Sequence, residues 1–341
     1  MASDEELRER LERFLRARTG RDLSVRGFKR LAGGASARLY GFELDDGEAP
    51  ARRLVMRMDP ERGDILSSRA AEYALLATAR EAGVRVPEVH WFGDAGAGLG
   101  AAFFVMDHVD GESLGRRLLR ETRYSKTRER LPADLARELA RIHAIDPTDP
   151  RLREHLDREP AGVGAEIERY RTIMETAAGG HPMPVLELAG RWLERAAPSG
   201  GETTLVHGDF RIGNVLFDEN GLTAVLDWEL SHAGDPMEDL GWLCVRAWRF
   251  GADDLPAGGL CSREHLWSLY EQASGRRVDP ERAMYWEIFG NWKWAIICMV
   301  QAAGHKAGRF PDVELAAIGR RVAEVEWELL DLLEQQGSHA G

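Results

Sequence analysis

Hydrophobic residues in the first third of the chain follow two different periods. Over residues 5–18 and again over 68–81, apolar side chains recur every three or four positions, which predicts two amphipathic helices. Other apolar runs are short and bounded by turn residues such as Asp45-Asp46-Gly47, a pattern typical of strands. The expected strands cover residues 37–43, 53–58, 86–92 and 102–106.

The pattern changes after about residue 112, where helical spacing dominates. Two short apolar runs, 215–217 and 224–226, interrupt it, and the intervening Asp218-Glu219-Asn220-Gly221 is typical of a hairpin turn. The sequence therefore predicts an α+β protein with two lobes. A small antiparallel β lobe with a helix is expected over residues 1–107, and a larger, mainly helical lobe over residues 108–341.

The bulk composition fits this two-lobed picture and limits the partners. The chain has 341 residues, of which 44% are hydrophobic and 30% charged, as in ordinary globular proteins. Its formal net charge is -12, so it has no general electrostatic reason to bind nucleic acid or an anionic membrane. We therefore expect a small molecule as its partner.

Neither cysteine usage nor hydropathy indicates export. The three cysteines include no C-x-x-C pair, which argues against a disulfide framework and against a zinc knuckle. The first residues are acidic where a signal peptide would be basic, and no apolar segment follows them. The longest apolar stretch, residues 295–300, is far shorter than a membrane span. We expect a cytoplasmic protein, and the sequence does not indicate its oligomeric state.

The segment from His207 to Asn214 carries the strongest chemical signal. Its spacing, H-x-D-x-x-x-x-N, is that of a kinase catalytic loop. Phosphoryl transfer needs a carboxylate that faces the acceptor hydroxyl, and oxygen ligands that hold Mg²⁺. Asp209 is the candidate for the first task. Asn214 and Asp227, the latter just after the predicted hairpin, are the candidates for the second.

Two other classes of site are excluded by the same residues. The pattern G-x-x-x-x-G-K-[ST] does not occur, so the chain is not a P-loop protein. His207 and Asp209 have no further ligands at zinc spacing, so a metal hydrolase is not supported.

Three segments together resemble the aminoglycoside phosphotransferase family: residues 207–218, 225–229 and 234–241. This family belongs to the protein-kinase-like superfamily, with choline and fructosamine kinases as relatives. Most of all, the chain resembles the kinase-like domain linked to certain acyl-CoA dehydrogenases. The resemblance extends over roughly residues 25–310. It implies a two-lobed protein-kinase-like fold that uses ATP and Mg²⁺.

The resemblance also implies a role for each residue of the motif. Asp209 would accept or orient the proton of the acceptor hydroxyl, while Asn214 and Asp227 would bind Mg²⁺. His207 would support the catalytic loop by hydrogen bonding, and Asp239 would brace that loop from the following helix.

On the nucleotide side, one residue departs from the kinase pattern. Kinases use a strand lysine that contacts the phosphates and pairs with a helix glutamate. The chain has no lysine between Lys29 and Lys126, so Arg57 is expected to take this role, with Glu72 as its partner. An arginine binds phosphate bidentately but is longer than lysine. The alternative is that Arg57 is a surface residue on an exposed strand.

Two backbone segments complete the expected nucleotide site. Gly33, Gly34 and Ser36 belong to a small turn whose N–H groups could approach the phosphates. The backbone near Met106 and His108 matches the strand that links the lobes, and we expect it to hydrogen-bond adenine.

The sequence leaves the acceptor open. Arg57 and Lys293 favour a hydroxy acid or an acyl thioester, whereas the family at large favours an amino sugar. The C-terminal aromatic residues either wall the acceptor pocket or pack in the core. The alternative to an enzyme is a nucleotide-binding pseudokinase that acts as a sensor or scaffold, motivated by the missing lysine.

Overall fold

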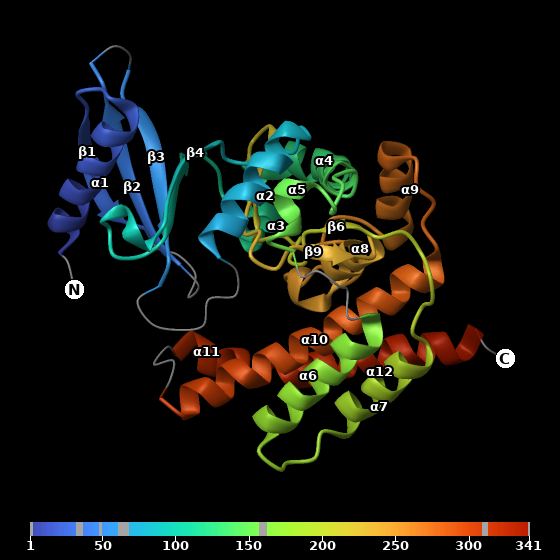
Figure 1. Ribbon diagram of the computed structural model, residues 1–341. Coiled ribbons are helices and arrows are strands. Elements are labelled where there is room, and N and C mark those ends of the chain that lie inside the picture. The colour runs from blue at the N-terminus through green and yellow to red at the C-terminus, as the bar shows by residue number, and fades with distance from the viewer. Residues whose placement is uncertain are drawn as a thin grey trace.

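The N-terminal part of the chain is built around one five-stranded antiparallel sheet (Figure 1). The structure, a computed structural model, describes residues 3–31, 37–47, 50–60, 68–156, 162–308 and 313–339. The strand order is β1-β2-β3-β5-β4. The strands are β1 (Ser24–Arg30), β2 (Arg38–Asp45), β3 (Arg52–Met58), β4 (Val89–Gly93) and β5 (Phe103–Asp107).

Two helices, α1 (Asp4–Thr19) and α2 (Arg69–Glu81), flank this sheet. Helix α1 begins at Ser3, which forms a capping box with Glu6, and it ends at Gly20 in the left-handed conformation. Its apolar side packs in one cluster with Phe103 and Val105 of β5, whereas Phe104 belongs to the cluster that contains α2. Because successive strand residues face opposite sides, the two helices cover opposite faces.

The same alternation places Arg57 on β3. Leu54, Met56 and Met58 are buried in the cluster that includes α1. Arg57 lies between two of them in sequence and therefore faces the other side of the sheet, toward α2. The strand pattern alone thus directs this arginine away from the N-terminal core.

The rest of the chain is mainly helical, and α10 is its longest element (Figure 1). In Figure 1 the helices α6, α7, α10, α11 and α12 form a layer below the others. The helices are α3 (Gly115–Arg120), α4 (Ser125–Ile142), α5 (Pro150–Arg153), α6 (Gly162–Ala178), α7 (Pro184–Arg195), α8 (Met237–Cys244), α9 (Arg263–Ser274), α10 (Pro280–Lys306), α11 (Val313–Ile318) and α12 (Arg321–His339), with the 3-10 turns η2 (Thr122–Tyr124) and η3 (Arg246–Trp248). A further 3-10 turn, η1 (Ala95–Ala97), lies between β4 and β5 of the N-terminal sheet.

Two short strand pairs frame the candidate catalytic residues. The predicted hairpin is present as β7 (Val215–Asp218) and β8 (Gly221–Val225). A second pair, β6 (Thr204–Val206) with β9 (His232–Gly234), was not expected from the sequence, because each strand has only three residues. The predicted α+β, two-lobed architecture is confirmed. Within the described residues, no helix is both long and apolar enough to cross a bilayer.

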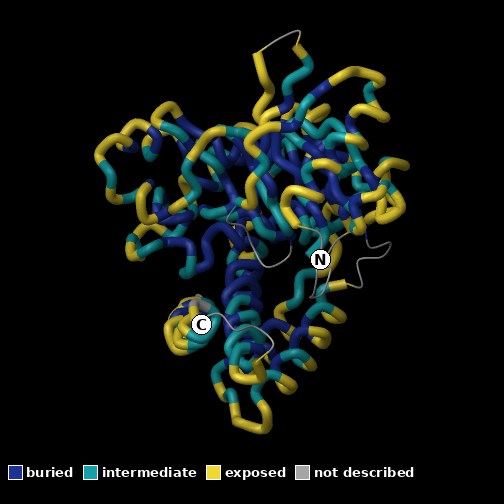
Figure 2. The backbone as a smooth tube through the Cα atoms, turned by 90° about the vertical axis from the view of Figure 1, so that its left-hand side faces the viewer, coloured by how far each residue is buried: buried dark blue, intermediate teal, exposed yellow. Residues whose placement is uncertain are grey.

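The hydrophobic core does not follow the expected lobe boundary at residue 107. The larger cluster joins the C-terminal helices to Leu75, Leu76 and Ala79 of α2 and to Phe104 of β5. Figure 2 shows buried backbone through the interior, with the exposed segments mostly at the periphery. The boundary at 107 stays a prediction. The packing ties α2 to the C-terminal helices through shared apolar side chains.

A buried ion-pair network holds the C-terminal helices together. Glu287 of α10 lies 2.6 Å from Nε of Arg263 on α9 and 3.0 Å from Nη2 of Arg249. The same Arg249 nitrogen lies 2.7 Å from Oε1 of Glu328 on α12. Glu287, Arg249 and Glu328 are all buried. A buried carboxylate is tolerated only when it is paired, so the network fixes the relative positions of these helices.

We expect Glu287→Gln to destabilise the fold strongly, because it leaves Arg263 without its carboxylate and Arg249 with Glu328 alone. Breaking a buried pair costs about 3–5 kcal/mol of unfolding free energy. The matched control is Glu187→Gln, which removes a half-exposed carboxylate 3.5 Å from Arg191 and should cost at most about 0.5 kcal/mol. Urea denaturation measures both, and equal losses would contradict the structural role of the network.

Candidate active site

The loop that follows β6 is held in shape by the backbone of Leu226. The Leu226 N–H donates to the carbonyl of Asn214 at 2.7 Å, and its carbonyl lies 3.0 Å from Nε2 of His207. Both ends of the 207–214 loop are therefore bonded to the backbone of the same residue. Gly208 has a φ of 79°, and a Cβ there would lie 2.4 Å from the Leu230 carbonyl oxygen, so only glycine fits.

A buried carboxylate on α8 caps the start of this loop. Asp239 accepts the N–H of His207 at 2.8 Å through Oδ2 and the N–H of Gly208 at 2.9 Å through Oδ1. His143 Nε2 lies 3.2 Å from the same carboxylate, and Tyr270 contacts the other ring nitrogen at 2.7 Å. Burial opposes its charge, but the bonds from His143 and the loop hold the pKa of Asp239 below its usual value.

His207 is a neutral ring with a defined tautomer. Its Nε2 faces the Leu226 carbonyl, which can only accept, so Nε2 carries the proton. Its Nδ1 accepts the N–H of Asp209 at 3.2 Å. Complete burial lowers the pKa of His207, which keeps Nδ1 unprotonated. The neutral ring thus links the backbone of Asp209 to the strand end beside Asp227.

The carboxylate of Asp209 is oriented by three side chains. Trp242 donates through Nε1 at 2.7 Å and Arg211 through Nε at 3.0 Å, both to Oδ1. Asn214 donates through Nδ2 to Oδ2 at 2.5 Å and to the Asp209 carbonyl at 3.0 Å. These bonds bring Asp209 and Asn214 into direct contact. They also leave Oδ1 of Asn214 as the group that could bind a metal.

Asp227 has an unusual backbone conformation. Its φ of 66° lies in the left-handed region, which non-glycine residues rarely adopt and which aspartate tolerates better than most. Such strain persists where the surroundings impose it, and it is common at functional sites. The carboxylate is one-third exposed and lies 3.2 Å from Nη2 of Arg57. The structure thus brings the β3 arginine to the residue predicted to bind metal.

Arg57 is partly buried among carboxylates, which rules out the alternative of a surface arginine. Its Nε lies 2.7 Å from Glu72 of α2, whose carboxylate also pairs with the buried Arg69 at 2.8 Å. Burial alone would lower the pKa of Arg57, but Glu72, Asp227 and Glu229 raise it. Burial raises the pKa of Glu72 against the effect of its two arginines. The predicted Arg57–Glu72 pair is present in the geometry.

The remaining nucleotide-site residues are less fully placed. Gly33, Gly34 and Ser36 lie outside the described residues. Met106 lies in β5 opposite Val55, in the strand that joins the two parts of the chain. The His108 N–H donates to the Arg53 carbonyl at 3.0 Å. The predicted adenine contact at His108 would therefore use its carbonyl group or displace this bond.

The donors at the site fit magnesium better than a transition metal. The described residues contain no group of three or more His, Cys, Asp or Glu side chains able to hold a metal ion. Mg²⁺ does not need such a cage, because it keeps several waters and is completed by substrate phosphates. The amide oxygen of Asn214 and the carboxylate of Asp227 are hard oxygen ligands of the kind it prefers.

A buried cation lies near Asp209 on the side of α10. Lys293 is 92% buried in its side chain, 3.7 Å from Glu238 and 5.1 Å from the ring centre of Trp242. Burial opposes its charge, but nearby groups including Tyr170, Glu238 and Asp209 raise its pKa. Lys293 therefore does not lie on a solvated face of α10. Most of the nearby aromatic residues are buried in the core.

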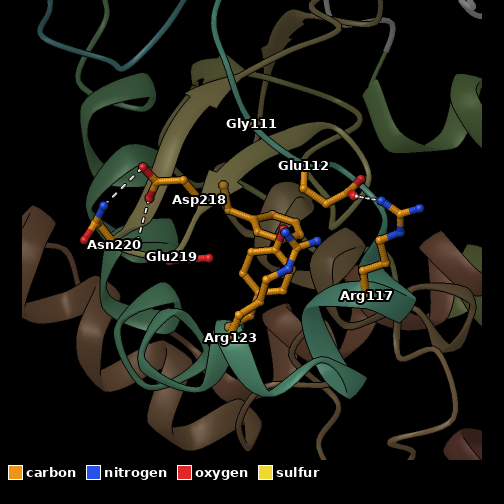
Figure 3. A pocket seen from close by; sticks show the side chains of 9 residues that line it. Gly111, Glu112, Arg117, Arg123, Asp218, Glu219 and Asn220 are labelled. Carbon is orange, nitrogen blue, oxygen red and sulfur yellow. Dashed lines mark hydrogen bonds and ion pairs between the residues drawn. The ribbon is translucent and has the colours of Figure 1, made fainter.

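One cavity of about 480 Å³ lies beside the β7–β8 hairpin (Figure 3). It is lined by none of the predicted catalytic or metal residues. Both of its arginines are paired with carboxylates, Arg117 with Glu112 at 2.7 Å and Arg123 with Glu121 at 2.7 Å. We assign it no part in the chemistry.

Several residues of the site were given no role from the sequence. Glu229 and Arg211 each stand two positions after a predicted residue, which is the only signal that could have indicated them. His143 and Tyr270 lie far away in sequence and reach Asp239 only through the fold. No spacing rule connects such residues.

Comparison with known proteins supports the family that the three sequence segments resemble. The family model for the phosphotransferase enzyme family matches residues 27–276. Acyl-CoA dehydrogenase family member 10 of Mus musculus is 33% identical over 202 residues, which cover 57% of this chain and 18% of the mouse protein. The matched regions span less than a quarter of the length of the first such relatives. The family predicted from the three segments is confirmed.

Solved structures show the same fold. A Ralstonia eutropha protein provisionally assigned as an aminoglycoside phosphotransferase superposes with a TM-score of 0.74 at 24% identity, over 94% of this chain and 97% of that chain. The GDP complex of aminoglycoside 2'-phosphotransferase-IIIa superposes with a TM-score of 0.63 at 15% identity, over 98% and 99%. At these identities the likeness shows the fold alone.

His232 should make stability depend on pH at the alkaline side. Burial opposes its charge, but Glu238 at 3.0 Å raises its pKa from 6.5 to about 9. Because the folded pKa exceeds the unfolded one, the stabilisation is complete below pH 6.5 and is lost as pH rises through about 9. Allowing for the partly exposed ring, the unfolding free energy of the native chain should fall by about 1–2 kcal/mol between these two pH values through this group. His232→Gln should remove that fall. Urea unfolding at both pH values measures the unfolding free energy. An equal fall in the native chain and in His232→Gln would contradict this role of His232.

Proposed function

Because the chain belongs to the phosphotransferase enzyme family, it is a small-molecule phosphotransferase, and we propose that it transfers the γ-phosphate of ATP to a hydroxyl group with Mg²⁺. One observation carries the proposal. Arg57 from the sheet lies 3.2 Å from Asp227, while Asn214 lies 2.5 Å from Asp209. A candidate phosphate-binding cation thus contacts one candidate metal ligand, and the other candidate metal ligand contacts the candidate base.

Each residue has a distinct task in this proposal. Asp209 orients the acceptor hydroxyl and receives its proton, with its carboxylate held by Trp242 and Arg211. Asn214 and Asp227 would hold Mg²⁺, which supplies charge neutralisation at the phosphates. Arg57 would contact the phosphates from the sheet side. His207 and Asp239 keep the loop in the conformation that aims Asp209.

Asp209→Asn should lower kcat by at least about 10²–10⁴, because the amide keeps the shape but cannot accept a proton. Asp209→Ala should also abolish transfer, while the affinity for magnesium and a non-hydrolysable ATP analogue stays within about threefold. Steady-state turnover and calorimetric binding measure the two effects. The exposed Asp254→Asn serves as the matched control and should turn over normally. Near-normal turnover by Asp209→Ala would refute the assignment.

The acceptor is proposed to be anionic, a hydroxy acid or an acyl thioester. Lys293 is buried with a raised pKa, and Arg211 lies on the Asp209 carboxylate, so two cations stand close to the transfer point. They would attract a carboxylate or phosphate on the acceptor and repel the ammonium groups of an amino sugar. The kinship with acyl-CoA dehydrogenase family members points the same way.

Transfer of radiolabelled phosphate from ATP should occur on hydroxy acids or their thioesters and not on amino sugars. Lys293→Met should lower kcat/KM for the anionic acceptor about tenfold, the effect of one lost charge contact, without changing nucleotide affinity. Lys306→Met, at the exposed end of α10, is the control. Transfer to amino sugars alone, with no effect of Lys293→Met, would reverse the choice of acceptor.

A nucleotide-binding protein without turnover is the second candidate. It is favoured by the arginine in place of lysine and by the ion pair that Arg57 makes with Asp227. Magnesium-dependent ATP binding, with no turnover on any acceptor class, would support it. The joint presence of Asp209, Asn214 and Asp227 favours the enzyme, because a scaffold requires none of them.

A further inference from the structure

A single guanidinium group contacts three carboxylates at the junction of the two lobes. Arg57 Nε lies 2.7 Å from Oε2 of Glu72, and Nη2 lies 3.4 Å from the other oxygen of that residue. The same Nη2 lies 3.2 Å from Asp227 and 3.2 Å from Glu229. Glu229 is 12% exposed in its side chain, so this pair is largely shielded from solvent.

The contacts divide the guanidinium into two ends. Nε contacts Glu72 of α2 alone, whereas Nη2 contacts Glu72 at 3.4 Å and also Asp227 and Glu229, which follow β8. A lysine has one compact ammonium group and cannot reach both sides in this way. The planar fork of arginine can, because its donors point in fixed and different directions. A partner for the far end is thus a requirement that arginine adds to the site.

Asp227 alone would be a poor partner for that end. The proposed function needs its carboxylate as a magnesium ligand, and Arg57 would then compete with the metal for the same oxygens. Glu229 offers a second carboxylate at the same distance, two residues further along the chain. With Glu229 in place, Asp227 can leave the arginine while Nη2 keeps a carboxylate at 3.2 Å, in addition to the Glu72 oxygen at 3.4 Å.

We propose that Glu229 is a positioning residue that holds the far end of Arg57, so that the arginine replaces a lysine without blocking the metal ligand. The inference rests on the proposed function only in placing a magnesium nucleotide at this site. Glu72, Arg57 and Glu229 then act as one unit, with the guanidinium clamped at both ends and its position set before the nucleotide arrives.

A double-mutant cycle on binding tests this unit without any acceptor or turnover. The dissociation constant of the magnesium complex of a non-hydrolysable ATP analogue is measured by calorimetry for the native chain, Glu229→Gln, Arg57→Lys and the double variant. Glu229→Gln should weaken binding about tenfold in the native chain and by less than about twofold in the Arg57→Lys background. Glu229→Asp, which keeps the charge, should recover part of the loss.

The outcomes separate the alternatives. Equal weakening by Glu229→Gln in both backgrounds means that Glu229 acts on the metal or nucleotide directly, which overturns the inference. No weakening in the native chain overturns it as well. A native chain that does not bind the nucleotide at all overturns the proposed function and this inference together. Thermal unfolding of each variant verifies that it is folded, and Glu229→Asp supplies the comparison if Glu229→Gln is not.

Discussion

The active-site geometry depends on one buried carboxylate. Asp239 on α8 accepts two consecutive backbone N–H groups at the start of the catalytic loop, where glycine is required by both φ and the Leu230 carbonyl. Unpaired, these buried donors would each cost about 1–3 kcal/mol, so the loop has little freedom to adopt another path. The start of the 207–214 loop takes its position from this contact, and the backbone of Leu226 holds the other end at Asn214.

From that loop the constraints extend to both lobes. His207, neutral and buried, connects the backbone of Asp209 to Leu226, and Leu226 in turn precedes the strained Asp227. Asp227 then meets Arg57, which β3 directs toward α2 by the alternation of its side chains. A chain of short polar contacts therefore links α8, the catalytic loop and the N-terminal sheet. The shared apolar packing of α2 with the C-terminal helices keeps these polar contacts aligned.

The sequence could predict the parts of this site that have fixed local spacing. Asp209, Asn214 and Asp227 stand at offsets set by one loop and one hairpin, and the amphipathic periods indicated α1, α2 and the sheet. Arg57 could be identified as a candidate because the chain has no lysine between Lys29 and Lys126. The partners that orient these groups could not be predicted, since Tyr270 reaches Asp239, and Glu229 reaches Arg57, only after the chain has folded. Strands as short as β6 and β9 carry too few residues for a period to appear.

We propose that Asn214 and Asp227 form a metal site that is complete only with nucleotide phosphates. Mn²⁺ in place of Mg²⁺ makes this directly measurable by electron paramagnetic resonance. We expect weak Mn²⁺ binding to the chain alone, at least about tenfold tighter binding with a non-hydrolysable ATP analogue, and loss of that gain in Asp227→Asn. Equally tight Mn²⁺ binding without nucleotide, or binding that Asp227→Asn leaves unchanged, would contradict it.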